Sequence, residues 1–218
     1  MTRSVRVVCF LILPLSWIGA STALAQAAVE PKLAIQVSAG PTLGHKSSGF
    51  VSAELDWKLT DKLDVFVEGG HMANVGTSSL ETNANVIANA IGAEVGSTGI
   101  SVNHFDVGIR FNITPPRPEI HPYVLFGIGG ARATTEVAFT RNGQVFDPSG
   151  EVLLGGDLSG TNTKAILMFG GGLLFPFSTR YFIDAGYRFG GILSKASDIE
   201  NDITIKTQRI MVGVGVRF

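Results

Sequence analysis

The chain has 218 residues, with 17 basic and 18 acidic side chains and a mean hydropathy of +0.29. It contains no basic patch of the kind that binds nucleic acid, so nucleic acid is excluded as a partner. Its single cysteine, Cys9, excludes a fold held together by internal disulfides.

The first 25 residues have the pattern of a secretory signal peptide. Arg3 and Arg6 precede an apolar run over 7–18, and Ala23-Leu24-Ala25 supplies small residues at both positions that determine cleavage. The alternative is a membrane anchor, but the run is shorter than the roughly 20 residues that a spanning helix needs. We therefore expect export, with cleavage after Ala25.

The rest of the chain, 26–218, predicts eight strands. In each segment apolar and polar residues alternate, as they do in a strand with two different faces. The segments are 32–44, 50–59, 62–75, 101–113, 121–137, 164–177, 180–193 and 203–218. The clearest is 50–59, where every odd-numbered residue from Val51 to Leu59 is apolar and every even-numbered residue from Ser52 to Lys58 is polar.

The connections differ in length. Those at 60–61, 114–119 and 178–179 are short, whereas 76–100, 138–163 and 194–202 are longer, and 44–49 is a short exception. Short turns on one side and longer loops on the other are typical of outer-membrane barrels, with the short turns in the periplasm.

Two of the longer connections contain local signals of their own. Residues 80–95 suit a brief helix, although their asparagines are mediocre helix formers. Asn142-Gly143 suits a tight hairpin turn, so the third outer loop, 138–163, is expected to be two strands extended above the membrane.

Alternation alone does not decide which face of a barrel points outward, but glycine placement, the aromatic strand ends and the final Phe218 together do. Eight glycines fall on the polar face: Gly108, Gly127, Gly129, Gly170, Gly172, Gly186, Gly213 and Gly215. On an outer surface they would weaken the strands, whereas opposite long polar side chains in a narrow interior they make room. The polar face therefore points inward and the apolar face meets lipid. The predicted fold is all-β: a closed, antiparallel, up-and-down transmembrane β-barrel of eight strands.

Aromatic residues gather near the strand ends on the presumed periplasmic side. They are Trp57, Phe111, Phe175, Phe177 and Tyr181. Aromatic girdles of this kind mark membrane interfaces, so a girdle is favoured over random placement.

The inward face carries charges of both signs. They are Glu54, Asp56, Lys58, Glu68, Asp106, Arg110, Asp184, Arg188, Arg209 and Arg217. Isolated charges in a dry interior are costly, so they are expected to pair in a polar network that fills the lumen. The alternative is a narrow ion path, which an eight-stranded barrel filled by side chains disfavours.

No motif for catalysis, cofactor binding or metal binding is present. His45, His71, His104 and His121 form no spaced metal motif and are interpreted as surface or lumen side chains. Asp147 and Asp157 do not have the spacing of a calcium loop. We expect no cofactor and no enzymatic activity.

The end of the chain resembles the C-terminal signal by which outer-membrane barrels are recognised for assembly. Gly213, Val216 and Phe218 match that signal, while Met211 stands where a polar residue is usual. The resemblance implies that the last strand engages the barrel-assembly machinery.

The mature chain as a whole resembles the small OmpA/OmpX-like outer-membrane β-barrels. Residues 122–129 and 185–189 carry the similarity most clearly. Some barrels of this size are lipid A deacylases with a histidine next to a serine near the outer end of a late strand. The stretch 186–191 has no histidine, and none occurs after His121, which disfavours that activity.

The expected function is that of a non-enzymatic surface protein that spans the outer membrane. Outer-membrane lipids are its expected partners, the longer loops serve adhesion or recognition of a ligand that the sequence does not identify, and we expect a monomer. Two alternatives stay open: a narrow porin-like channel for small solutes or apolar compounds, and a soluble periplasmic barrel that binds a lipid.

Overall fold

The computed structural model describes residues 31–113, 120–150, 158–193 and 205–218. The predicted signal peptide, 1–25, and the predicted connections 114–119 and 194–202 lie outside these residues.

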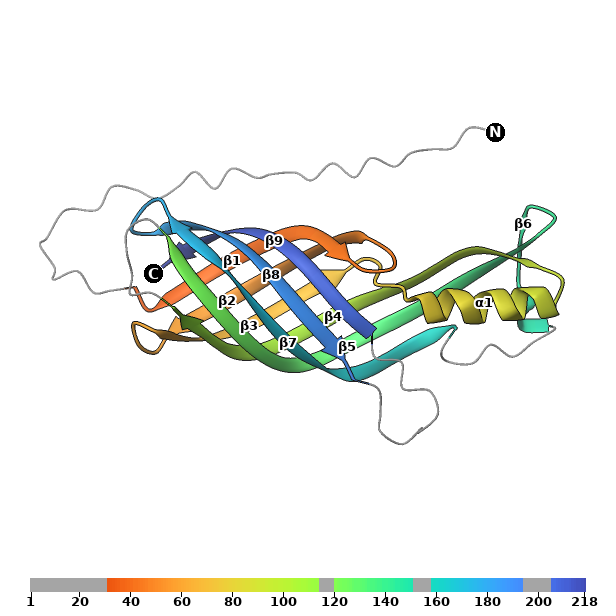
Figure 1. Ribbon diagram of the computed structural model, residues 1–218, viewed down its shortest axis with the longest axis horizontal. Coiled ribbons are helices and arrows are strands. Elements are labelled where there is room, and N and C mark those ends of the chain that lie inside the picture. Colours follow the sequence, from red (N-terminus) through yellow and green to blue (C-terminus); the bar gives the residue numbers. More distant parts are fainter. Residues whose placement is uncertain (1–30, 114–119, 151–157, 194–204) are drawn as a thin grey trace, which may run out of the picture. The chain divides into compact units, whose positions relative to one another are not determined.

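Long antiparallel strands make up most of the described chain (Figure 1). They are β1 (Leu33–Leu43), β2 (Ser48–Lys58), β3 (Leu63–Met72), β4 (Glu94–Asn112), β5 (His121–Arg141), β7 (Gly160–Pro176), β8 (Tyr181–Ile192) and β9 (Ile205–Arg217). Between them lie the helix α1 (Ser78–Ala90), the short strand β6 (Gln144–Phe146) and a 3-10 turn, Pro148–Gly150.

The strands close into a barrel. Each long strand pairs with its sequence neighbours in the order β1-β2-β3-β4-β5-β7-β8-β9, and β9 pairs back onto β1 with Val216 opposite Ile35. All of these pairings are antiparallel, and β6 pairs only with the far end of β5. The predicted eight-stranded up-and-down barrel is confirmed.

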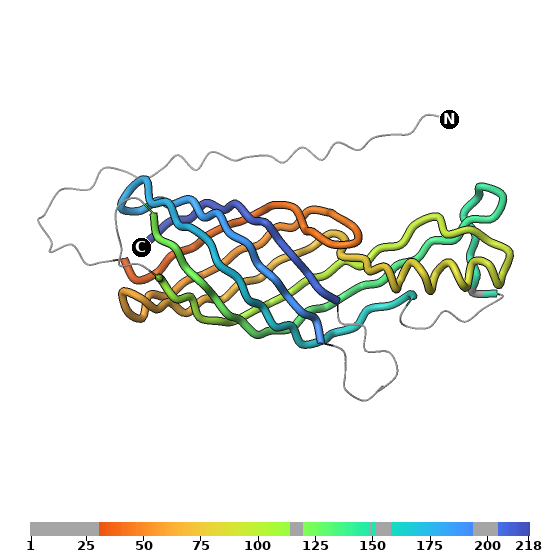
Figure 2. Tube along the Cα trace, viewed as in Figure 1, coloured from red at the N-terminus to blue at the C-terminus, as the bar shows by residue number. Residues whose placement is uncertain are grey.

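The outer ends of three strands lie well beyond their predicted bounds, and one of them, β7, begins at Gly160 rather than at 164. β4 begins at Glu94 rather than at 101, and β5 continues to Arg141 rather than ending at 137. The additional residues of β4 and β5 pair with each other up to Glu94 opposite Thr140, so β4 and β5 continue beyond the other strands as a ribbon (Figure 2). The predicted extension of the strands above the barrel therefore exists. The outer part of β5 pairs mainly with β4, because β6 pairs with only Phe139–Arg141.

The predicted turn at Asn142-Gly143 joins β5 to β6. Both residues have positive φ, +54° and +75°, which a type I′ hairpin turn requires and which asparagine and glycine tolerate best. A local sequence signal was sufficient here because the turn geometry depends on these two residues alone.

The helix α1 lies within the first long connection, close to the predicted 80–95 but earlier. Thr77 caps it by accepting a hydrogen bond from the Leu80 backbone N–H at 3.3 Å. Leu80, Ala84 and Ala88 are its buried residues, at the four-residue spacing that places them on one face. In the described part of the chain, no helix combines the length and hydropathy needed to cross a membrane.

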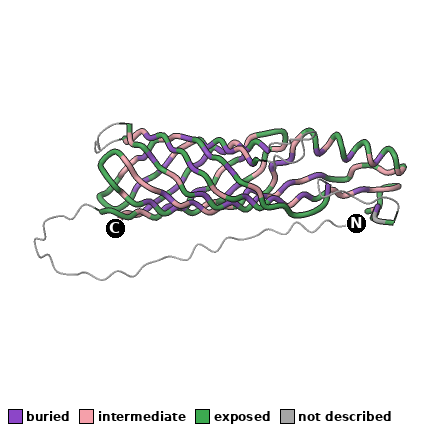
Figure 3. The backbone as a smooth tube through the Cα atoms, turned by 90° about the horizontal axis from the view of Figure 1, so that it is seen from below, coloured by how far each residue is buried: buried purple, intermediate pink, exposed green. Residues whose placement is uncertain are grey.

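The outward face of the barrel is apolar. Buried and exposed residues alternate along the long strands (Figure 3). Many of the exposed residues are large hydrophobic side chains that stay more than 40 % exposed, including Val37, Phe105, Ile128 and Phe169. A barrel that buried its apolar face would show the opposite. The exposed apolar surface is therefore the lipid-facing one, as glycine placement predicted.

Glycines on the inward face make room for large side chains. A Cβ atom at Gly172 would lie 2.6 Å from the Tyr123 hydroxyl oxygen, and one at Gly186 would lie 2.9 Å from it. A Cβ at Gly215 would overlap the ring of Phe182. Long polar side chains were expected to need this room. That expectation holds at Gly170, which lies against Arg188, whereas Gly172, Gly186 and Gly215 make room for aromatic rings.

Candidate functional site

An alternating chain of acidic and basic side chains crosses the barrel interior. Arg110 of β4 pairs with Asp56 of β2, with Nη1 3.0 Å from Oδ1, and also with Glu54. The other carboxylate oxygen of Glu54 lies 2.8 Å from Nη2 of Arg188 in β8. Arg188 in turn pairs with Glu68 of β3. The two guanidinium groups therefore each join two carboxylates.

The chain continues to the opposite wall. Nη1 of Arg209, in β9, lies 3.0 Å from Glu68 Oε1 and 3.0 Å from the Nε2 atom of His104. The other ring nitrogen of His104, Nδ1, lies 2.6 Å from Asp106 Oδ2. We call the eight residues Asp56, Arg110, Glu54, Arg188, Glu68, Arg209, His104 and Asp106 the lumen network.

Asp184 is bound separately by neutral donors. The Tyr123 hydroxyl donates to it at 2.9 Å, and the Gln36 side-chain amide donates at 2.8 Å. The Arg110 guanidinium lies over the Tyr123 ring, 4.6 Å from its centroid, and so connects this group to the lumen network.

The lumen network is shielded from water. Its three arginines are at most 2 % exposed, and Glu68 and Asp106 are fully buried. Towards the outer side of the barrel the interior is apolar, with Phe50, Met72, Val102, Ala131, Ile166, Ile192 and Met211 among the residues of one cluster. Phe66, Leu125, Leu174 and Phe182 belong to a second apolar cluster in the interior. Side chains thus fill the lumen at the level of the network, as expected for eight strands.

Besides Asp184, two more of the predicted residues lie outside the lumen network. Lys58 pairs with Asp61 at 2.9 Å at the end of β2, and Arg217 is half-buried with its guanidinium 4.9 Å from the Phe182 ring centroid. Both occupy the last inward positions of their strands. Alternation identified their face correctly but contained no information about depth along the barrel.

Tyr123 and Gln36 donate hydrogen bonds to Asp184 that the sequence did not predict. Both occupy inward positions, and Tyr123 lies level with Gly172, which itself lies level with Gly186. Adjacent glycines on neighbouring strands, all on one face, indicate that a bulky side chain must fill the space between them. That signal could have identified Tyr123.

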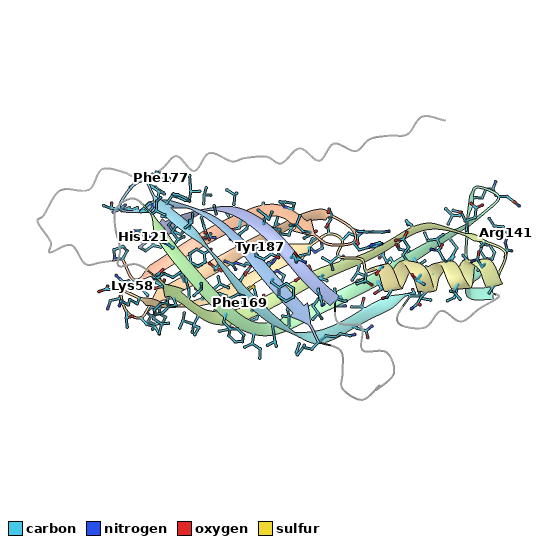
Figure 4. The ribbon with its side chains drawn as sticks, in the orientation of Figure 1. Lys58, His121, Arg141, Phe169, Phe177 and Tyr187 are labelled. Atoms are coloured by element: carbon cyan, nitrogen blue, oxygen red, sulfur yellow. The ribbon has the colours of Figure 1, made fainter. Side chains whose placement is uncertain are left out.

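The predicted girdle residues lie at one end of the barrel. Trp57, Phe111, Phe177 and Tyr181 are exposed and Phe175 is half-buried. The rings of Phe177 and Tyr181 stack, with 6.1 Å between centroids and 13° between planes. Figure 4 shows Phe177 at the same end as Lys58 and His121. Their role as a membrane girdle stays a prediction.

The C-terminal strand is fully integrated into the barrel. Gly213 lies opposite Ser38 and Val216 lies opposite Ile35 of β1. Phe218 is exposed, and its backbone N–H donates to the Leu33 carbonyl at 2.8 Å. Both described ends of the barrel chain therefore lie at the end that carries the short turns.

An ordered projection lies at the opposite end of the barrel. It consists of α1 and the ribbon parts of β4 and β5, with β6 at the tip of β5 (Figure 2). The buried face of α1 joins the outer apolar cluster, against which Val95 and Val137 of the ribbon also pack. β4 pairs with β3 only from Val102 onward and β5 pairs with β7 only as far as Thr135, so we call residues 78–101 and 136–146 the outer projection.

The short connection 44–49 fastens the outer projection to the rim. His45 Nε2 lies 2.6 Å from Glu81 Oε2 in the first turn of α1. The Lys46 ammonium donates to the Thr98 hydroxyl at 2.5 Å and to its carbonyl at 3.2 Å. The hydrogen bond with His45, together with the charge of Lys46, holds the pKa of the Glu81 carboxyl below its usual range.

The surface of the outer projection carries exposed apolar side chains away from the apolar face of the barrel. Val86 of α1 is 62 % exposed and Val145 of β6 is 87 % exposed. Beside the turn, the Arg141 guanidinium lies 3.8 Å from the Phe146 ring centroid, and its Nη2 donates to the carbonyl of Ile91 after α1. The tip is therefore tied to the helix end. In the described ranges, histidine, cysteine and acidic residues form no group that would hold a metal ion.

The comparisons with known proteins agree with this architecture. The family model of the outer membrane protein beta-barrel domain matches residues 10–218. Neisserial surface protein A has a similar structure, with a TM-score of 0.53 and 15% identity over 85% of this chain and 97% of that chain. At this identity the similarity concerns the fold alone. No curated protein matches the chain.

Two further solved barrels give lower scores. The N-terminal β-barrel domain of Pseudomonas aeruginosa OprF has a TM-score of 0.49 at 14% identity, covering 85% of this chain and 97% of that chain. Ail, the attachment invasion locus protein of Yersinia pestis, has a TM-score of 0.49 at 17% identity, covering 87% and 100%.

Proposed function

The chain belongs to the outer membrane protein β-barrel domain family, and from this premise we propose that it is a closed, non-enzymatic barrel that presents the outer projection for recognition at the cell surface. The single observation that supports this role is the order of that projection. A helix, a two-stranded ribbon and a fastening connection hold exposed side chains in one arrangement.

Pre-ordering of this kind favours binding. A loop that is already ordered loses less conformational entropy when it meets a partner, so more of the contact free energy becomes affinity. Val86 and Val145 give the outer projection exposed apolar area that a partner would bury on contact.

The orientation follows from the turns. The described ends of β1 and β9 lie at the end of the barrel that carries the short connections 59–62 and 177–180. In outer-membrane barrels this end is periplasmic, so the outer projection would face the exterior. Export would use residues 1–25 as a signal peptide cleaved after Ala25, and assembly would use the C-terminal strand with Gly213, Val216 and Phe218.

The lumen network supports a closed barrel rather than a channel. Arg188 of β8 contacts carboxylates of both β2 and β3, and its side chain is buried. A conducting path would need these buried ion pairs to separate. The His104–Asp106 pair has the composition of a catalytic dyad, but both side chains are enclosed where no substrate arrives, so we propose no enzymatic role.

Cysteine labelling of intact cells tests the orientation, because the chain after Ala25 has no cysteine. Val145→Cys should react with a membrane-impermeant maleimide, whereas Thr60→Cys, in the turn after β2, should react only after the outer membrane is opened. Labelling of Thr60→Cys alone on intact cells would contradict the proposed display.

A further inference from the structure

A groove of about 630 Å³ crosses the outward face of the barrel over β9, β1, β2, β3 and β4. Its floor is formed by the short outward residues Ala39, Ala53 and Gly69. Larger side chains border it, among them Phe105, which lies opposite Gly69 and is 58 % exposed. A Cβ atom at Gly69 would have no neighbour nearer than 3.9 Å, so the depression is open space.

The groove follows the hydrogen-bonding direction of the sheet. Val214, Val37, Ala53 and Gly69 occupy paired positions on four successive strands. A second row runs from Val212 through Ala39, Val51 and His71 to Asn103. Because adjacent strands lie about 4.8 Å apart, five strands give the groove a length of about 19 Å.

One end of the groove is polar. The His71 Nδ1 and Asn103 Oδ1 atoms lie 2.9 Å apart in a hydrogen bond on the exposed surface. The next position in the same row is Arg132 of β5, which lies opposite Asn103 and is also exposed. The imidazole of His71, the amide of Asn103 and the guanidinium of Arg132 thus lie side by side on three adjacent strands, β3, β4 and β5.

This polar end lies at the boundary of the apolar band. Beyond Arg132 the next outward positions of β5 are Thr134 and Glu136, whereas towards the periplasm they are apolar. On β9 the outward face becomes polar only at Gln208, two outward positions beyond Val212. The groove therefore runs from the membrane boundary into the band that meets lipid.

We propose that this groove is a binding site for one membrane lipid of the outer leaflet whose headgroup is an anionic phosphate monoester. An acyl chain occupies the floor over Ala53 and Gly69, and the phosphate lies against Arg132 with the side-chain amide of Asn103, which His71 holds in place, as a further donor. Guanidinium groups form strong paired hydrogen bonds with phosphate oxygens. One leaflet contributes about 15 Å of the roughly 30 Å hydrocarbon core. A groove that follows hydrogen-bond rows inclined by a strand tilt of about 40° rises by about 12 Å, which is most of that depth.

Native mass spectrometry of the full-length mature barrel tests the site. The protein is released from detergent that contains dimyristoyl phosphatidic acid, dimyristoyl phosphatidylcholine or dibutyryl phosphatidic acid, and retained lipids are counted. Wild-type protein should retain one dimyristoyl phosphatidic acid in about tenfold preference to the phosphatidylcholine, because a charged hydrogen bond contributes about that factor. Dibutyryl phosphatidic acid, which has the headgroup without a long chain, should not be retained.

Variants distinguish the two parts of the site. Arg132→Ala should abolish the preference for phosphatidic acid, whereas Lys206→Ala, an exposed cation elsewhere on β9, should preserve it. Ala53→Leu and, independently, Gly69→Val should reduce retention of both dimyristoyl lipids, whereas Ala165→Leu on β7 should not. Heat-modifiable mobility on gels verifies that each variant is folded.

Three results would overturn the proposal. The first is equal retention of both dimyristoyl lipids by the wild type, and the second is an equal effect of Ala53→Leu and Ala165→Leu. The third is a dimer that Ala53→Leu dissociates, because the groove would then hold a second copy of the chain. None of these results affects the surface display proposed above, which cysteine labelling tests by itself.

Discussion

Arg188 of β8 reaches Glu54 of β2 across the barrel interior, with Nη2 2.8 Å from Oε2, although β1 and β9 separate the two strands in the sheet. The same guanidinium also pairs with Glu68 of β3. Backbone hydrogen bonds hold each strand only to its neighbours, so this side chain adds a direct link between opposite walls. The link is buried, and its effect on stability depends on whether all partners remain.

Arg188→Ala should therefore destabilise the barrel strongly. Removal of one partner from a buried ion pair leaves uncompensated charge and typically costs about 3–5 kcal/mol. The free energy of unfolding in urea, followed by the mobility difference between folded and heated protein, measures the loss. Lys206→Ala, on the exposed face, is the matched control and should change stability by less than about 0.5 kcal/mol. Equal stability of the two variants would show that Arg188 is not needed to balance Glu54 and Glu68.

The sequence predicted much of this arrangement because a strand has a period of two. That period assigned Glu54, Glu68 and Arg188 to the interior, and it assigned Lys58 and Arg217 there with equal weight. It could not identify ion-pair partners, because partners on opposite walls depend on the tilt and stagger of the closed barrel. Arg188 of β8 reaches Glu54 of β2 and Glu68 of β3 only because the sheet closes into a barrel.

The outer projection was less predictable for a related reason. The segment 94–100 contains Gly96 and Gly99 and lacks the strong apolar alternation of the membrane-facing strands, since it meets water and α1 rather than lipid. Its strand conformation comes from pairing with β5, a contact between distant parts of the chain. The turn at Asn142-Gly143, by contrast, is determined by two adjacent residues and was predicted correctly.

Gly215→Ala should destabilise the barrel because the added methyl group would overlap the Phe182 ring. Overpacking of this kind typically costs about 1–3 kcal/mol. The urea assay used for Arg188→Ala applies here as well. Gly191→Ala is the control, because a Cβ atom at Gly191 would meet nothing within 4 Å. The double variant Gly215→Ala with Phe182→Leu should regain part of the loss. If it is no more stable than Gly215→Ala alone, the ring is not the source of the cost.

The purified barrel should not conduct ions. The lumen network and the apolar cluster above it leave the central arginines at most 2 % exposed, so ions meet no continuous water path there. Recordings in planar bilayers should show no steady unitary currents under conditions in which a large porin gives clear steps. Reproducible steps of uniform size from the folded protein would favour the channel alternative over a closed barrel.

Acid should loosen the contact between α1 and the connection 44–49. The pKa of Glu81 is lowered in the folded protein, so its contribution to docking is complete above the ordinary carboxyl pKa of about 4.3 and is lost as the pH falls through the lower folded value. A spin label at Val86→Cys should therefore become more mobile at low pH. Glu81→Gln should remove this transition. A transition that survives in Glu81→Gln would assign it to another group.

The exposed valines of the outer projection should matter for recognition and not for folding. Val86 and Val145 lie on the outer surface of α1 and β6, so replacing both with serine removes apolar contact area without opening a cavity in the core. We expect heat-modifiable mobility to be unchanged. Cells of a non-adherent strain that express the protein are applied to a panel of host-cell and matrix surfaces. On each surface to which the wild-type protein confers adhesion, the double variant should lower adhesion about tenfold, since two buried valines contribute at least about 1.4 kcal/mol. Val86→Ile with Val145→Ile is the control, because it preserves an apolar surface of similar shape. Equal adhesion of the serine and isoleucine variants would remove this surface from the proposed contact.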